Sequence, residues 1–234
     1  MAYKNRFVLA AAAADELEYD LGSGEAVAKG SVVLKQDGGV ATASYARFNS
    51  KTKSGVLTGN VVADREDMHI TCNEFIVHNE NDLSAVGGAS ISKAGKRLNA
   101  DRVDYYKARE FAETIGGWAR LTDSDGSVLN AAKIDYNMAA GVANAYGGVD
   151  INSPARNLTA SADSAVYKTD NSGYVELLGN AKATQNGNSV AGDKLRLTNT
   201  NVAIADGDVK IIYIPEKQPA VLGKEKQGAE QALA

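Results

Sequence analysis

The chain has 234 residues, and its 29 Asp and Glu against 25 Lys and Arg give a formal net charge of −4, which argues against nucleic-acid binding. Its single cysteine excludes an internal disulfide, and any zinc site would have to be built without a cysteine pair. Aromatic residues make up 6% of the chain and much of the apolar content is Ala and Val, so we expect a thin or elongated core.

The first segment of the chain allows two interpretations. Lys4 and Arg6 precede a short apolar run at residues 7–14, and the small residues that end this run fit the cleavage rule of a signal peptide. The run also suits the beginning of a first strand, because later strands are preceded by similar residues. We therefore assign residues 1–13 either to a signal peptide or to the start of the first strand. No other segment is long and apolar enough for a membrane span.

A short motif organises the rest of the chain. The stretch Ala-Asp-Glu-Leu-Glu-Tyr-Asp at 14–20 recurs in degraded form at residues 43, 72, 100, 131, 162 and 192. Glycines at positions 30, 59, 87, 116, 147, 179 and 207 keep step with it, at intervals of 28 to 32 residues. Two unrelated landmarks that share one period indicate a repeat architecture.

Each repeat reads as two strands. In the first strand of the first repeat, Leu17 and Tyr19 alternate with Glu16 and Glu18, which is typical of a half-buried strand with one charged face. A turn follows, and a longer strand then passes through the recurring glycine, which marks a bend or bulge. A second turn closes the unit. We predict an all-β domain over residues 14–214, built from about seven repeats of 28–32 residues with two strands each.

The residues after 214 differ in composition from the repeats. Lys, Glu, Gln and Ala dominate positions 215–234, and little there could be buried. We predict a charged, disordered tail.

Few residues suggest catalysis or metal binding. His69 and His78 lack the spaced Cys or carboxylate partners of a metal site. Cys72 occupies an alanine position of the repeat, so we expect a small buried side chain. Acidic residues recur at one repeat position, where a structural hydrogen bond to the neighbouring strand is the favoured role; they are Asp15, Asp101, Asp163 and Asp193. We find no motif of a nucleophile elbow, a P-loop or a dinucleotide site, and predict no enzymatic activity, metal or cofactor.

The apolar side of the strands is the better candidate for a functional site, although an ordinary core would show the same pattern. Trp118 interrupts a column of small residues, and Arg120 follows on the same predicted face. Trp118 is therefore either an anchor at a groove or a core residue beside a bulge that turns Arg120 outward. The predicted groove-lining residues are Leu17, Tyr19, Val32, Leu34, Phe48, Val61, Phe75, Val77, Ile91, Val103, Tyr105, Trp118, Ile134, Tyr136, Val149, Ile151, Leu195 and Leu197.

These repeats resemble a known family. The copies of Ala-Asp-x-Leu-x-Tyr-Asp, with Gly-Ser-Val at 30–32 and Gly-Asn-Val at 59–61, are similar to the LptA/OstA family of periplasmic lipopolysaccharide-transport proteins. The resemblance covers roughly residues 14–214. It implies an open antiparallel β-jellyroll, export to the periplasm, and an apolar interior that holds the acyl chains of lipid A.

The resemblance also implies partners. Lipopolysaccharide is the expected cargo, and copies of the chain are expected to join head to tail. The ends are expected to dock onto jellyroll domains of an LptC-like protein at the inner membrane and an LptD-like protein at the outer membrane. Three alternatives stay open: a structural β-solenoid or filament protein, an LptC-like docking jellyroll with an anchor ahead of residue 14, and, more distantly, a polysaccharide-active solenoid enzyme.

Overall fold

The fold is taken from a computed structural model, which describes residues 11–36, 38–168, 174–198 and 202–214. Ala11–Ala13 form strand β1, which pairs with β3, as expected if the N-terminal run begins the first strand. Most of the predicted signal segment and the whole predicted tail, residues 1–10 and 215–234, lie outside the described residues. Within the described ranges, no helix is long and apolar enough to cross a membrane.

The described elements are almost entirely strands. They are β1 (Ala11–Ala13), β2 (Glu16–Asp20), β3 (Glu25–Gln36), β4 (Gly39–Asn49), β5 (Ser54–Arg65), β6 (Met68–Val77), β7 (Asp82–Lys93), β8 (Lys96–Tyr106), β9 (Phe111–Thr122), β10 (Val128–Ala131), β11 (Lys133–Asn137), β12 (Val142–Ser153), β13 (Leu158–Lys168), β14 (Val175–Gln185), β15 (Asn188–Leu197), β16 (Ala203–Asp206) and β17 (Lys210–Ile212). Two short 3-10 turns, η1 (Lys107–Arg109) and η2 (Pro154–Arg156), join strands.

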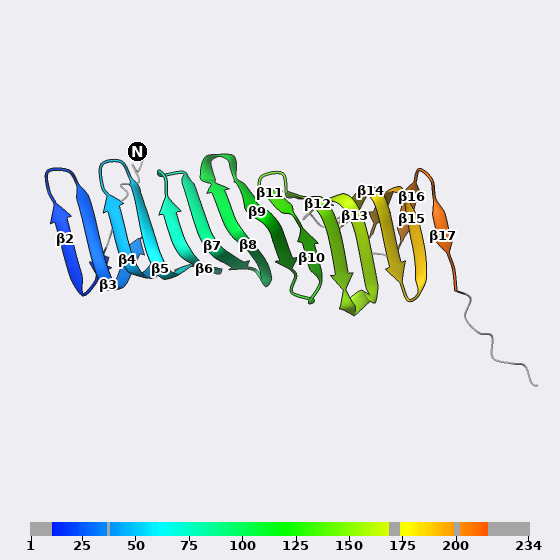
Figure 1. The fold of residues 1–234 in the computed structure, drawn as a ribbon, viewed down its shortest axis with the longest axis horizontal. Helices are drawn as coiled ribbons and strands as arrows, with labels where there is room; N and C mark the ends of the chain where they lie inside the picture. The colour runs from blue at the N-terminus through cyan, green and yellow to red at the C-terminus, as the bar shows by residue number, and fades with distance from the viewer. Residues whose placement is uncertain (1–10, 37, 169–173, 199–201, 215–234) are drawn as a thin grey trace, which may run out of the picture.

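All seventeen described strands belong to one antiparallel sheet in which neighbours along the chain pair with each other. Three strands are interrupted, because β1 and β2 both pair with β3, β10 and β11 both lie between β9 and β12, and β16 and β17 both pair with β15. If each interrupted strand is counted once, the sheet has fourteen described strands, as seven two-strand repeats predict. Figure 1 shows these strands side by side from β2 to β17, which makes the molecule long and narrow.

The recurring glycines bend the strands. In β5, Gly59 and Asn60 both have positive φ, 84° and 50°, at a break in the register with β6 between Thr58 and Val61. A Cβ atom on Gly59 would lie 2.7 Å from the Ser44 side chain of β4, so only glycine fits there. The next position tolerates residues that accept a left-handed backbone, which explains the Gly-Asn and Gly-Ser pairs of the repeat.

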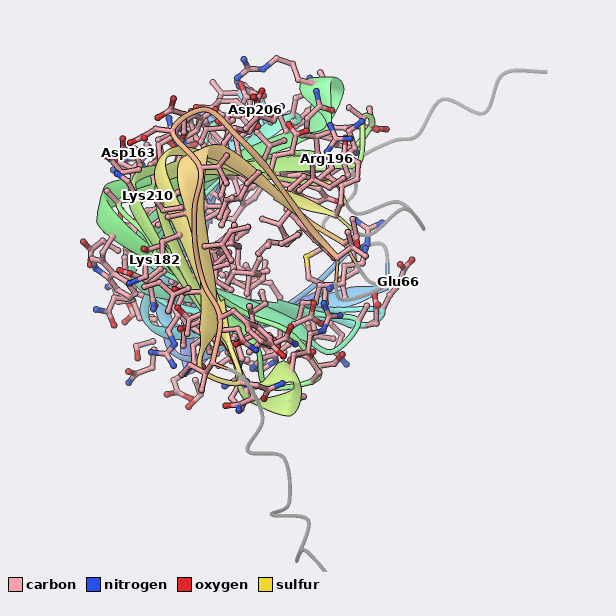
Figure 2. The ribbon with its side chains drawn as sticks, turned by 90° about the vertical axis from the view of Figure 1, so that its right-hand side faces the viewer. Glu66, Asp163, Lys182, Arg196, Asp206 and Lys210 are labelled. Atoms are coloured by element: carbon pink, nitrogen blue, oxygen red, sulfur yellow. The ribbon has the colours of Figure 1, made fainter. Side chains whose placement is uncertain are left out.

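The bulges divide the sheet into two limbs that face each other. In Figure 2, viewed along the molecule, the limbs enclose carbon-rich side chains, while Asp163, Lys182, Asp206 and Lys210 point outward. The first limb lies between the bulges and the turns that follow β2, β4, β6 and β8; the second limb lies between the bulges and the opposite turns. This arrangement confirms the predicted all-β, open jellyroll fold.

Candidate functional site

The strand register creates four rows of inward side chains along the sheet, because directly opposed residues of antiparallel strands share a face. Each limb has an inner row next to the bulges and a lip row next to the turns. The first lip row is Tyr19, Ala26, Phe48, Gly55, Val77, Leu83, Tyr105, Ala112, Tyr136, Ala143, Tyr167, Val175, Leu197 and Ala203. The first inner row is Leu17, Ala28, Ala46, Leu57, Phe75, Ala85, Val103, Thr114, Ile134, Ala145, Ala165, Leu177, Leu195 and Ala205.

The second limb has the same arrangement. Its inner row is Val32, Ala43, Val61, Cys72, Ala89, Ala100, Ala119, Ala131, Val149, Ala162, Ala181 and Gly192. Its lip row is Leu34, Ala41, Ala63, Ile70, Ile91, Leu98, Leu121, Leu129, Ile151, Ala160, Ala183, Val190 and Ile211.

Burial separates the rows into two kinds. Most inner-row side chains are buried, and Leu177 and Leu195 are 0% exposed. Larger lip-row side chains such as Leu34, Ile91 and Leu121 are half-buried and pack against this core. The inner rows therefore form a structural core, and the lip rows form the part of the interior nearest to the free edges of the limbs.

All predicted lining residues except Trp118 lie on these four rows. Tyr19, Phe48, Val77, Tyr105, Tyr136 and Leu197 lie on the first lip row, and Leu34, Ile91 and Ile151 on the second. Leu17, Phe75, Val103, Ile134 and Leu195 lie on the first inner row, and Val32, Val61 and Val149 on the second. The register thus brings together residues from every repeat.

The predicted inward position of Trp118 is wrong. In β9, three residues, Gly116–Trp118, lie opposite the single residue Asp101, whereas the break in β5 contains two. The extra residue shifts the alternation by one, so Ala119 faces inward and is 2% exposed, while Trp118 is 44% exposed. Arg120 is likewise on the outer face. The indole N–H of Trp118 donates to the Asp101 carboxylate, with a 2.7 Å separation.

Side chains from the two limbs approach each other near the middle of the sheet. Between Leu121 and Leu129 of the second limb and Ala143, Ala165 and Tyr167 of the first, the cavity measures about 10 Å³. Such a volume holds about one water molecule. A larger hollow of about 260 Å³ lies at the first lip beside Arg47 and the predicted lining residue Phe48.

Both ends of the sheet expose apolar side chains. Leu17, Tyr19 and Leu21 are exposed on or next to β2, which pairs with β3 alone among the described strands. At the other end, Ile211 and Tyr213 are exposed on or next to β17. These edge strands present unpaired backbone groups together with apolar side chains.

The recurring aspartates serve the bulges. Asp163 lies against Gly179, and its carboxylate accepts a hydrogen bond from the Asn180 amide at 2.9 Å. Asp15, Asp101 and Asp193 lie against the corresponding glycines in the same way. This supports a structural role, although the hydrogen bonds shown for Asp101 and Asp163 come from side chains rather than from backbone.

A polar cluster on the outer face has no counterpart in the sequence pattern, which places Asp104 in water. Asp104 and Ser84 are buried: the Ser84 hydroxyl donates to Asp104 at 2.7 Å, and the Arg102 Nε donates to the same oxygen at 2.6 Å. His78 Nε2 lies 2.7 Å from the Ser84 oxygen. Because the only hydroxyl proton goes to Asp104, His78 is the donor in this contact. These hydrogen bonds hold the Ser84 hydroxyl in place and do not activate it as a nucleophile.

The other residues singled out from the sequence are also accounted for. His69 pairs with Asp64 at 2.6 Å, apart from His78, and no cluster of three metal-ligating side chains occurs among the described residues. Burial raises the pKa of the Cys72 thiol, as suits a small core residue.

On the outer face, the hydrogen bond from Arg196 lowers the pKa of Glu176, with Lys194 adding a second contact at 3.3 Å.

The comparisons with known proteins identify the family. A search of the solved structures matches LptH, "the LptA homologous periplasmic component of the conserved lipopolysaccharide transport device from Pseudomonas aeruginosa", with 15% identity, coverage of 88% of this chain and 94% of that one, and a TM-score of 0.20. A search of curated proteins found no match. The family model described as "LptA/(LptD N-terminal domain) LPS transport protein" matches residues 41–202. Because this match covers more than half of the 234 residues, the chain belongs to the LptA/LptD N-terminal-domain family of lipopolysaccharide-transport proteins.

Proposed function

We propose that the chain is a lipopolysaccharide carrier that encloses the acyl chains of lipid A between its two limbs. The observation that carries the proposal is the continuity of the inward rows, which run from Leu17 and Tyr19 at one end to Ala205 and Ala203 at the other. Each methylene kept out of water contributes about 0.8 kcal/mol, so an acyl chain of a dozen carbons costs roughly 10 kcal/mol to expose. An apolar path across water removes that cost.

The repeat suits movement along the sheet. Successive rungs present similar apolar side chains, aliphatic or aromatic, so the affinity for an acyl chain stays nearly level along the path. Cargo pushed from behind does not have to leave one deep pocket. We assign this role to the domain at 14–214. Residues 1–13 are proposed as either a signal peptide or the start of the first strand, and residues 215–234 as a charged tail.

The two kinds of row have different roles in this proposal. The buried inner rows hold the limbs together, and the half-buried lip rows supply most of the surface that an acyl chain contacts. The cavity beside Tyr167 measures about 10 Å³, so we propose that the limbs part at this place when an acyl chain passes. Lip residues such as Phe48, Tyr105 and Ile151 are therefore proposed as the main lining.

The edge strands are proposed as docking sites. Family membership supports a place in the periplasm, where lipopolysaccharide passes between the two membranes. The exposed strands β2 and β17 would there accept further strands by β-augmentation. LptC-like and LptD-like jellyroll domains and further copies of the chain are the proposed partners. No catalytic residue, metal or cofactor is assigned.

Native mass spectrometry of the full chain with purified lipopolysaccharide tests the proposal. We expect a retained complex, and we expect the substitution Ile91→Lys on the second lip row to weaken it by placing a charge among the acyl chains. Ser90→Lys, on the neighbouring outward position, is the matched control and should bind like the parent. Circular dichroism checks that both variants fold.

The outcome also separates the carrier from its main alternative. A structural β-solenoid would have an interior filled with its own side chains and would retain no lipid. No retained lipid, or equal losses for Ile91→Lys and Ser90→Lys, would support the structural protein and contradict the carrier.

A further inference from the structure

Side chains from the two lips meet near the centre of the groove. Lys96, at the start of β8 on the second limb, places its Nζ atom 6.0 Å from the centroid of the Tyr167 ring on the first lip row. Asp123, just after β9, holds the same ammonium group at 2.5 Å. Because β8 and β13 are not neighbours in the sheet, this contact joins the limbs rather than adjacent strands.

The space between the limbs is narrow directly beside this contact. Tyr167 also lines the cavity of about 10 Å³, together with Leu121 and Leu129 of the second limb and Ala145 and Ala165 of the first. This space is too small for a hydrocarbon chain. The site where the lips meet is therefore also a site where cargo on the path along the rows would be stopped.

We propose that Lys96, Asp123 and Tyr167 form a latch that closes the groove and has to open each time an acyl chain passes. This inference rests on the proposed carrier function, because a latch matters only if chains travel through the groove. The Lys96 and Asp123 side chains, both on the second limb, are 43% and 35% exposed, so water and salt weaken the contact that holds the Lys96 ammonium group in position. A cation over an exposed aromatic ring shifts an equilibrium about two- to fivefold. The latch is thus weak enough for cargo to displace.

The test measures opening without any lipid. Cys72 is the only cysteine, so Cys72→Ala provides a background in which one reporter thiol is placed at a time. Ala145→Cys lies behind the latch at a position that is 3% exposed. Ala46→Cys lies on the same inner row, 4% exposed, on the distant strand β4. The rate of alkylation by a small apolar maleimide reports how often each site opens.

We expect Tyr167→Ala and Lys96→Met each to raise the alkylation rate at Ala145→Cys about two- to fivefold, and to leave Ala46→Cys unchanged. Tyr167→Phe keeps the ring and should behave like the parent. Raising the salt concentration should speed alkylation at Ala145→Cys in the parent, but have no further effect in Lys96→Met, because the charge that salt screens is gone.

Two results would overturn the latch. One is an unchanged rate at Ala145→Cys; the other is an equal rise at Ala46→Cys, which would mean that the substitutions loosen the whole fold. Adding lipopolysaccharide afterwards tests the carrier function separately: protection of both thiols supports carriage, and lack of protection counts against carriage whatever the latch variants show.

Discussion

Two leucines on one strand should differ sharply in their contribution to stability. Leu195 and Leu197 are two residues apart on β15 and face the same interior, but Leu195 is 0% exposed on the inner row whereas Leu197 is half-buried on the lip row. Leu195 lies opposite Leu177 and Ala205, so Leu195→Ala leaves a cavity between packed neighbours. We expect it to lower the free energy of unfolding by about 3 to 4 kcal/mol.

Leu197→Ala is the matched control. Its side chain is already partly in water, so the loss should be roughly 1 kcal/mol. Urea denaturation followed by far-ultraviolet circular dichroism measures both changes, and hydrogen exchange of the β14–β15 hairpin detects local opening if the repeats do not unfold as one unit. Equal losses, or a larger loss for Leu197→Ala, would refute the division into core rows and lip rows.

Three further predictions concern the bulges and the outer face. Gly116→Ala should lower the melting temperature more than Gly117→Ala does. A Cβ on Gly116 meets the Asp101 side chain at 2.5 Å, while one on Gly117 meets nothing within 4 Å. Similar melting temperatures for the two variants would contradict this packing. Trp118→Ala should leave retention of lipopolysaccharide in native mass spectra unchanged, and a clear loss would return this side chain to the lining. Hydrogen bonding lowers the pKa of Glu176 in the folded state, so its stabilising contribution is present above the unfolded value of about 4.3 and is lost as pH falls through the lower folded value. Glu176→Gln should flatten the loss of stability below pH ~4.5 in acid titrations, and an unchanged acid dependence would contradict this assignment.

Much of the architecture could be predicted from local patterns. The alternation of Leu17 and Tyr19 with acidic residues gives the orientation of a strand, and the spacing of the motifs gives the number of strands, because each repeat obeys the same local rules. The recurring glycine marks a bend since no other residue fits against the facing side chain, as at Gly59. These signals are short-range, so a single sequence displays them.

The features that local patterns missed depend on register or on distant contacts. One extra residue in the β9 bulge turns Trp118 outward. The sequence does not reveal this extra residue, because the Gly116-Gly117 pair resembles the other glycine pairs of the repeat. The meeting of Lys96 with Tyr167 depends on how the limbs lie across each other, which no spacing reveals. Asp104 is buried because an arginine and a serine enclose it on the outer face, where alternation alone predicts water.

Site-specific photo-crosslinking in cells shows whether acyl chains lie on the inner face of the sheet. A photoreactive residue at Phe75 or Tyr105, on the inner and lip rows of the first limb, should capture lipopolysaccharide. The same residue at Glu18 or Lys133, on the outer face, should not. Crosslinks confined to Glu18 and Lys133 would contradict the binding of acyl chains between the limbs.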